Sequence, residues 1–163
     1  MESSTNRADP VELLIENSKG RVEELLPIRY SRMMVSPFTF YRGAAAIMSY
    51  DLSQTPSTGL TLIADDDCHL LNFGGFATAE RKVVFDINDF DEVSLAPWEW
   101  DVKRLAASFV IAGQSNGFDP ADRKEATWLA AKIRTWGLSA DPAGSWSSPR
   151  LDGKWHHHRP ISS

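Results

Sequence analysis

The sequence predicts an α+β fold, rich in helices, with a short pair of strands that carries polar loops. Four segments begin at or just after a proline and repeat apolar residues at intervals of three and four, which is the spacing of an amphipathic helix. Two short, mostly apolar runs at 60–63 and 82–85 have the length and the flanking turn residues of strands. Acidic residues follow each run, so the ends of the two strands should present carboxylates.

The first helices are marked by prolines. Asp9 before Pro10 supplies an N-cap and a first-position residue for a helix that Gly20 should end. A short helical stretch over 21–26 should stop before Pro27, because the residue that precedes a proline is disfavoured in the α region.

The middle of the chain should contain one longer helix and the two strands. The helix is predicted over 36–52, and 54–59 is a turn cluster that follows it. The strands at 60–63 and 82–85 are joined by the Gly-rich segment 73–76, which is predicted to turn. The two strands should therefore be neighbours, with their acidic ends side by side.

Two more helices are predicted near the C-terminus. Apolar residues over 98–113 keep helical spacing and predict the best-buried helix of the protein. A last helix should cover 120–136 and stop at Gly137. Residues 1–137 are expected to form one domain, and residues 138–163, which have neither helical nor alternating pattern, a flexible tail.

Composition narrows the class of protein. A net charge of -5 and a pI near 5.3 argue against a nucleic-acid binder, which normally presents a basic face. No apolar run approaches the roughly 20 residues that span a bilayer, so no membrane role is expected. The single cysteine, Cys68, cannot form an internal disulfide, and the N-terminus lacks the apolar run of a secretory signal. We therefore expect a cytoplasmic protein.

Three polar residues have the spacing of a phosphoryl-transfer site. Asp67 is followed five residues later by Asn72, and Asp89 comes seventeen residues after Asn72. The first carboxylate suits a group that accepts or orients a hydroxyl proton, while an amide oxygen and a second carboxylate are hard ligands for Mg²⁺. Taken alone, each of these residues is also an ordinary turn or capping residue.

The order of these motifs resembles the protein-kinase-like superfamily, in particular its aminoglycoside-phosphotransferase branch, where a Gly-Asp-x-His-x-x-Asn loop precedes an Ile-Asp-Phe loop. A closer resemblance, over 29–117, is to domain-of-unknown-function family 2252. The matching blocks occur in the family's order and are Arg29–Met33, Phe40–Gly43, Asp66–Gly74, Asn88–Glu92 and Trp100–Ser108. The resemblance implies that the strand pair and its loops correspond to the C-terminal lobe of a kinase-like fold.

The resemblance also implies roles for the loop residues. Asp67 would be the catalytic base, and His69 would orient the loop. Asn72 and Asp89 would bind Mg²⁺ and so bridge to the phosphates of ATP, with Asp91 as a further ligand. The implied reaction moves the γ-phosphoryl group of ATP to a hydroxyl of a small molecule.

Outside these loops, arginines and one acid are further candidates. Arg29, Arg32 and Arg42 flank an aromatic cluster and either bind phosphate, with Arg42 as the candidate for the nucleotide, or pair with the acidic loops. Asp86 is a possible additional metal ligand. Asp101, at the start of the helix after Pro97, is expected to cap that helix or anchor the catalytic loop.

The chain departs from the family pattern in two ways. Asp66 replaces a glycine, which would cost about 1 kcal/mol if the backbone φ there were positive. Relatives are also longer, so we expect a C-terminally truncated member, weakly active or inactive alone.

The run His156–His158 is expected to be surface tail rather than a zinc site.

The alternative is a non-catalytic binding module that keeps an acidic cation site. Its exposed apolar helix faces would then be covered by a protein partner. The candidates for that surface are Phe109, Trp128 and Trp136.

Overall fold

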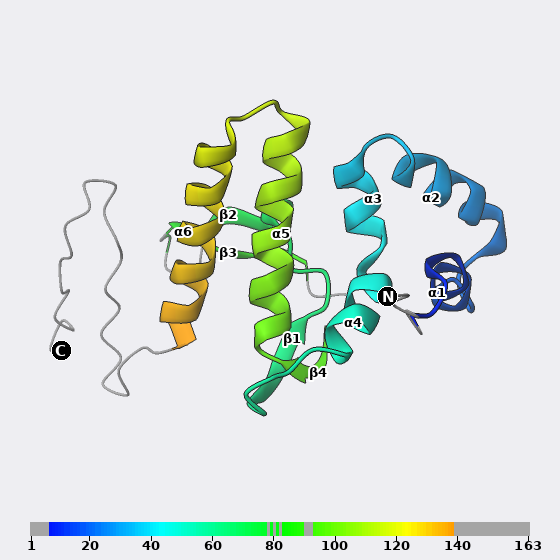
Figure 1. Ribbon diagram of the computed structural model, residues 1–163, viewed down its shortest axis with the longest axis horizontal. Helices are drawn as coiled ribbons and strands as arrows, with labels where there is room; N and C mark the ends of the chain where they lie inside the picture. Colours follow the sequence, from blue (N-terminus) through cyan, green and yellow to red (C-terminus); the bar gives the residue numbers. More distant parts are fainter. Residues whose placement is uncertain (1–6, 78, 80, 82, 90–92, 139–163) are drawn as a thin grey trace, which may run out of the picture.

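The structure is a computed structural model that describes residues 7–77, 79, 81, 83–89 and 93–138 (Figure 1). The described part is helix-rich α+β, as the sequence predicts. Its α-helices are α1 (Pro10–Asn17), α2 (Leu26–Met33), α3 (Pro37–Gly43), α4 (Ala45–Ser53), α5 (Glu99–Ser115) and α6 (Pro120–Leu138). Its strands are β1 (Thr61–Asp65), β2 (Phe73–Ala77), β3 (Val83–Ile87) and β4 (Val93–Pro97), and two short 3-10 turns are η1 (Glu23–Leu25) and η2 (Leu70–Asn72).

The strands form two antiparallel pairs, and this corrects the predicted strand pairing. β1 pairs with β4, with Asp65 opposite Val93, whereas β2 pairs with β3, with Phe73 opposite Ile87. The segment expected to turn at 73–76 is itself part of strand β2. Glycine at position 74 permits the close approach of Asn88, which follows the paired strand β3. A Cβ on Gly74 would collide with the side chain of Asn88. The acidic loops are therefore brought together by the return of the chain through η2 and β2.

Helix α5 is the central element of the described residues. It packs along α6 on one side and against α3 and α4 on the other, while β1 lies near its first turns (Figure 1). Helices α5 and α6 begin close to their predicted positions, 98 and 120. None of the helices that the structure describes is long and apolar enough to cross a membrane.

The N-terminal helices confirm two predicted starts and correct two boundaries. Asp9 caps α1 by accepting a hydrogen bond from the backbone N–H of Val11 at 2.8 Å. Pro27 lies in the first turn of α2 instead of ending a helix, since a proline at that position loses no intrahelical hydrogen bond. The predicted long helix over 36–52 is broken at Ala44, where the backbone leaves the helical region.

The break between α3 and α4 has a packing cause and a consequence for the site. A Cβ on Gly43 would lie 2.5 Å from Cγ of Met33, so only glycine lets α3 lie this close to α2. Met33 belongs to a small core with Ala44 and Ile47. The carbonyl of Gly43, freed by the break, accepts a hydrogen bond from Arg29 at 2.8 Å. The break thus helps to fix the side chain of Arg29.

Candidate functional site

The candidate site is the loop that follows β1. It runs through Asp66 and Asp67 to η2, and helix α5 holds it at three points. The Asp101 carboxylate accepts a hydrogen bond from the backbone N–H of Asp65 at 3.2 Å, which confirms the predicted anchoring role of Asp101. Ser108, fully buried, accepts one from the backbone N–H of Leu70 at 3.0 Å. The third point is an ion pair to Asp67.

Asp67 is held by Arg104 and His69. Arg104 Nη2 forms an ion pair with Asp67 Oδ1, and His69 Nε2 lies 3.4 Å from Asp67 Oδ2. Burial alone would raise the pKa of Asp67, but the contacts with His69 and Arg104 outweigh burial and hold that pKa below its usual value. Asp67 is therefore a carboxylate at neutral pH. Its side chain keeps 29% of its surface exposed, so it can still meet a ligand.

His69 links Asp67 to Arg42. Arg42 Nε donates a hydrogen bond to His69 Nε2 at 3.1 Å, the same nitrogen that faces Asp67. Nε2 of His69 therefore lies between the Arg42 guanidinium and the Asp67 carboxylate. Within the described residues Nδ1 is buried without a hydrogen-bond partner. His69 thus lies between an arginine and a carboxylate, and the loop-orienting role that the resemblance implies for it stays a prediction.

Asp65 joins the site as a buried carboxylate that the sequence analysis did not single out. Its Oδ2 accepts from Asn72 Nδ2 at 3.0 Å and its Oδ1 accepts from the backbone N–H of Asp67 at 3.3 Å. Burial raises the pKa of Asp65 to about 6, and the nearby carboxylates of Asp101 and Asp67 add to the increase. Asp65 therefore fixes both the predicted base and a predicted metal ligand.

The structure brings Asn72 next to Asp89. Asn72 Nδ2 donates to the backbone carbonyl of Asp89 at 3.3 Å. Both side-chain hydrogen bonds of Asn72 use the amide nitrogen, so its amide oxygen has no partner in the described part of the chain. The residue Asp89 is exposed. An amide oxygen beside a carboxylate residue fits the ligand preference of Mg²⁺.

The other candidate metal ligands lie outside the part of the chain that the structure describes. Asp91 and the run His156–His158 lie outside the described residues, as does the side chain of Asp86. Among the residues that are described, no group of three or more His, Cys, Asp or Glu side chains is placed to hold a metal ion. Within the described residues, the predicted metal ligands are therefore Asn72 and Asp89.

Asp66 does not carry the backbone strain that its replacement of glycine suggested. Over the described residues, the one positive φ outside glycine belongs to Arg81. The Asp66 carboxylate accepts a hydrogen bond from Ser94 Oγ at 3.1 Å, so the acid ties the loop to β4. The neighbouring Cys68 is fully buried.

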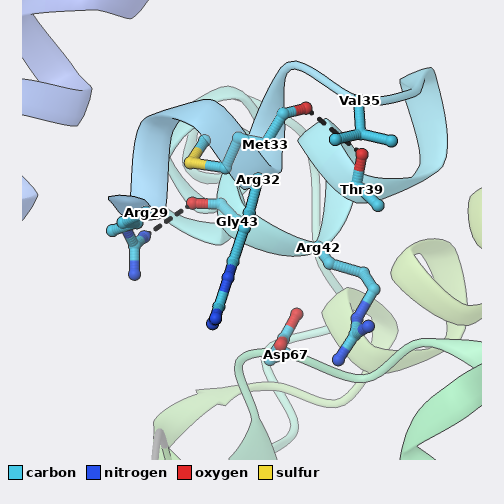
Figure 2. Close-up of a pocket in the computed structure, with 8 residues that line it drawn as sticks. All are labelled: Arg29, Arg32, Met33, Val35, Thr39, Arg42, Gly43 and Asp67. Atoms are coloured by element: carbon cyan, nitrogen blue, oxygen red, sulfur yellow. Dashed lines mark hydrogen bonds between the residues drawn. The ribbon is translucent and has the colours of Figure 1, made fainter. Parts of the chain in front are cut away.

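An open cleft of about 490 Å³ lies between α2, α3 and the loop. Figure 2 shows Arg29, Arg32 and Arg42 extending from the helices toward the side where Asp67 lies. The sequence left open whether these arginines pair with the acidic loops. In the described residues none of the three forms an ion pair, and the arginine that pairs with Asp67 is Arg104.

The sequence did contain a signal for Arg104 and Ser108, which were missed, in their spacing from the predicted anchor Asp101. Asp101, Arg104 and Ser108 are spaced by three and four residues in a helix whose other positions are largely apolar. All three are buried, with at most 3% of their surface exposed. Buried polar residues at helical spacing must have partners, so this stripe predicts contacts to a polar loop.

Residues 21–135 match a protein family described as an uncharacterized protein conserved in bacteria, domain of unknown function 2252. The chain belongs to this family. The match includes the whole loop from Asp65 to Asn72 and the supporting stripe on α5. No curated protein and no solved structure matches the chain. Family 2252 is thus the identity that the comparisons support, and they assign no reaction to it.

Proposed function

We propose that the loop between β1 and β2 is the catalytic loop of a kinase-like phosphotransferase, which moves the γ-phosphoryl group of ATP to a hydroxyl of a small molecule. The observation that carries the proposal is the environment of Asp67. It is an ionised carboxylate, held by Arg104 and His69, with an exposed edge on an open cleft. That is what a group that receives a substrate hydroxyl requires.

The lowered pKa of Asp67 favours one of its two possible roles. A carboxylate that is paired with Arg104 binds a proton weakly, so its main contribution is to accept a hydrogen bond and aim the hydroxyl oxygen. Proton transfer from the hydroxyl to Asp67 then follows late, when the oxygen has begun to bond to phosphorus. His69 and Arg104 keep the carboxylate in one orientation during this step.

Asn72 and Asp89 are the proposed Mg²⁺ ligands. The amide oxygen of Asn72 is without a partner in the described residues, and the amide nitrogen of Asn72 donates to the backbone carbonyl of Asp89. When bound there, Mg²⁺ would neutralise charge on the transferring phosphates. Asp91 remains a predicted further ligand, and Arg42, which the sequence predicted for the nucleotide, lines the same cleft as Asp67.

Thermal unfolding with and without Mg·ATP tests this proposal. Ligand at about 100 times its dissociation constant should add about 2.7 kcal/mol to the free energy of unfolding. The variant Asp89→Ala should lose this increase, whereas Glu125→Ala, an exposed acid on α6, should keep it. An unchanged midpoint in the wild-type chain, with ATP and Mg²⁺ both in excess, would refute the nucleotide site.

The second candidate is the non-catalytic module that binds a protein partner. It is favoured by α6, where Trp128 is 57% exposed and Leu129 is 42% exposed. Phe109 is half-buried, and the side chain of Trp136 lies outside the described residues. A cooperative unfolding transition that Mg·ATP does not shift would support this candidate over the first.

A further inference from the structure

Three arginines converge on the cleft above Asp67, and each is only partly engaged. Arg29 uses one nitrogen to reach the carbonyl of Gly43, and Arg42 uses Nε to reach His69. Arg32 is exposed, and its guanidinium has no hydrogen bond or ion pair in the part of the chain that the structure describes. Donor groups on all three guanidinium ions are therefore available to a ligand in the cleft.

The charge of this cluster is not balanced by the protein. The one carboxylate that lines the cleft, Asp67, is already paired with Arg104. The three cleft arginines thus leave a local excess of positive charge in a chain whose net charge is -5. Guanidinium groups from α2 and α3, which extend toward one cleft, can bind an oxyanion such as phosphate or carboxylate (Figure 2).

The position of the cleft indicates which molecule carries the oxyanion. Asp67 lines the cleft, whereas the proposed metal ligands Asn72 and Asp89 do not. A molecule in the cleft therefore meets the residue that receives the hydroxyl and does not contact the proposed metal ligands. The volume of about 490 Å³ suits a small metabolite.

We infer that the cleft binds the acceptor molecule by an oxyanion group, phosphate or carboxylate, held by Arg29, Arg32 and Arg42. The hydroxyl of that same molecule then lies against Asp67. The oxyanion site stands on the arginines alone, and its assignment to the acceptor rests on the proposed phosphotransfer. The predicted acceptor is thus a small hydroxylated acid or phosphate ester, not a neutral or cationic alcohol.

Isothermal titration with inorganic phosphate and with citrate, in EDTA and without nucleotide, tests the site in the full chain. Arg32 is the residue to change, because it is exposed and supports no other described group. We expect Arg32→Gln to weaken binding about tenfold or more and Arg32→Lys to weaken it less, since lysine keeps the charge but not the fork. The control Lys124→Gln removes an exposed charge on α6 and should change binding less than about twofold.

The outcomes separate this inference from the proposed function. No saturable binding of either anion up to about 10 mM, or an equal loss in Arg32→Gln and Lys124→Gln, would overturn the oxyanion site. Binding that depends on Arg32, in a chain that Mg·ATP does not stabilise, would keep the oxyanion site and remove the phosphotransfer.

A competition experiment then tests whether the oxyanion belongs to the acceptor or to the nucleotide. The probe is a non-hydrolysable ATP analogue, AMP-PNP, with Mg²⁺, added to the phosphate-loaded chain. Simultaneous binding of both supports an acceptor site. Displacement of phosphate, together with weaker AMP-PNP binding by Arg32→Gln, would overturn that assignment and give the arginines to the nucleotide.

Discussion

The ion pair between Asp67 and Arg104 makes a sharp prediction about stability. The Arg104 side chain is 4% exposed, so Asp67→Ala leaves a buried guanidinium without its counter-charge. Breaking one side of a buried ion pair typically costs about 3–5 kcal/mol. We expect about 3 kcal/mol, the low end of that range, for two reasons. Asp67 itself is 29% exposed, and Arg104 keeps its hydrogen bond to the carbonyl of Tyr41 at 3.2 Å.

A double-mutant cycle in urea unfolding, followed by circular dichroism, measures this coupling. The variants are Asp67→Ala, Arg104→Met and the double change, and the expected coupling is about 2 kcal/mol. Asp67→Asn is the matched control and should cost less, because its amide oxygen still accepts from Arg104. A coupling below about 0.5 kcal/mol would mean that the ion pair does not hold the loop.

The pH dependence of the coupling has a defined sign. The folded-state pKa of Asp67 lies below its ordinary value of 3.8, so its contribution is complete above about pH 4. It is lost as the pH falls through the folded pKa. A coupling that was lost between pH 5 and pH 7 instead would contradict the assignment. For assays of turnover, Asp67→Asn is then the informative variant, because Asp67→Ala combines a chemical loss with partial unfolding.

Two more predictions concern the supports of the loop. The pKa of Asp65 is raised to about 6 from 3.8, so the folded state binds its proton more readily and stability should fall by up to about 3 kcal/mol as pH rises from 4 to 6. Asp65→Asn should flatten that slope in urea titrations at several pH values, and an equal slope in both chains would refute it. Ser108→Ala leaves the backbone N–H of Leu70 without a partner and should cost about 1–3 kcal/mol by thermal unfolding, against less than about 0.5 kcal/mol for the exposed control Ser115→Ala. Equal costs in the two serine variants would show that the Leu70 hydrogen bond is not a support.

Local signals predicted the starts of α1 and α3 but missed α2. Asp9 before Pro10 and Ser36 before Pro37 start helices because capping needs only the residues on either side. The break at Ala44 was not predictable in the same way. It depends on the approach of Gly43 to Met33, which is a contact between α3 and α2 that helical spacing does not reveal.

Strand pairing also depended on distant contacts. Spacing identified β1 and β3, but it could not assign β4 as the partner of β1, since 27 residues lie between Asp65 and Val93. The Gly-rich segment 73–76 looked like a turn because glycine is rare inside strands. Here the absence of a Cβ on Gly74 leaves room for the side chain of Asn88 beside it.

In the candidate site, too, some contacts were predictable from the sequence and others were not. The adjacency of Asn72 and Asp89 followed from motif spacing, and the structure brings these two residues together. The partner of Asp67 did not follow. Three arginines near the aromatic cluster were the expected candidates, yet the ion pair comes from Arg104, which is 37 residues away on α5.

The stripe on α5 explains why the loop needs little rigidity of its own. Asp101, Arg104 and Ser108 hold the backbone of Asp65, the carboxylate of Asp67 and the backbone of Leu70, in the same order along both segments. Seven residues of helix rise about 10.5 Å, so a straight helix fixes three points of the loop along a line of that length. The geometry of the loop is therefore set by a packed helix, and a change such as glycine to Asp66 is accommodated. A substitution that displaces α5, even far from the cleft, should therefore displace all three contact points together and change the geometry of the loop.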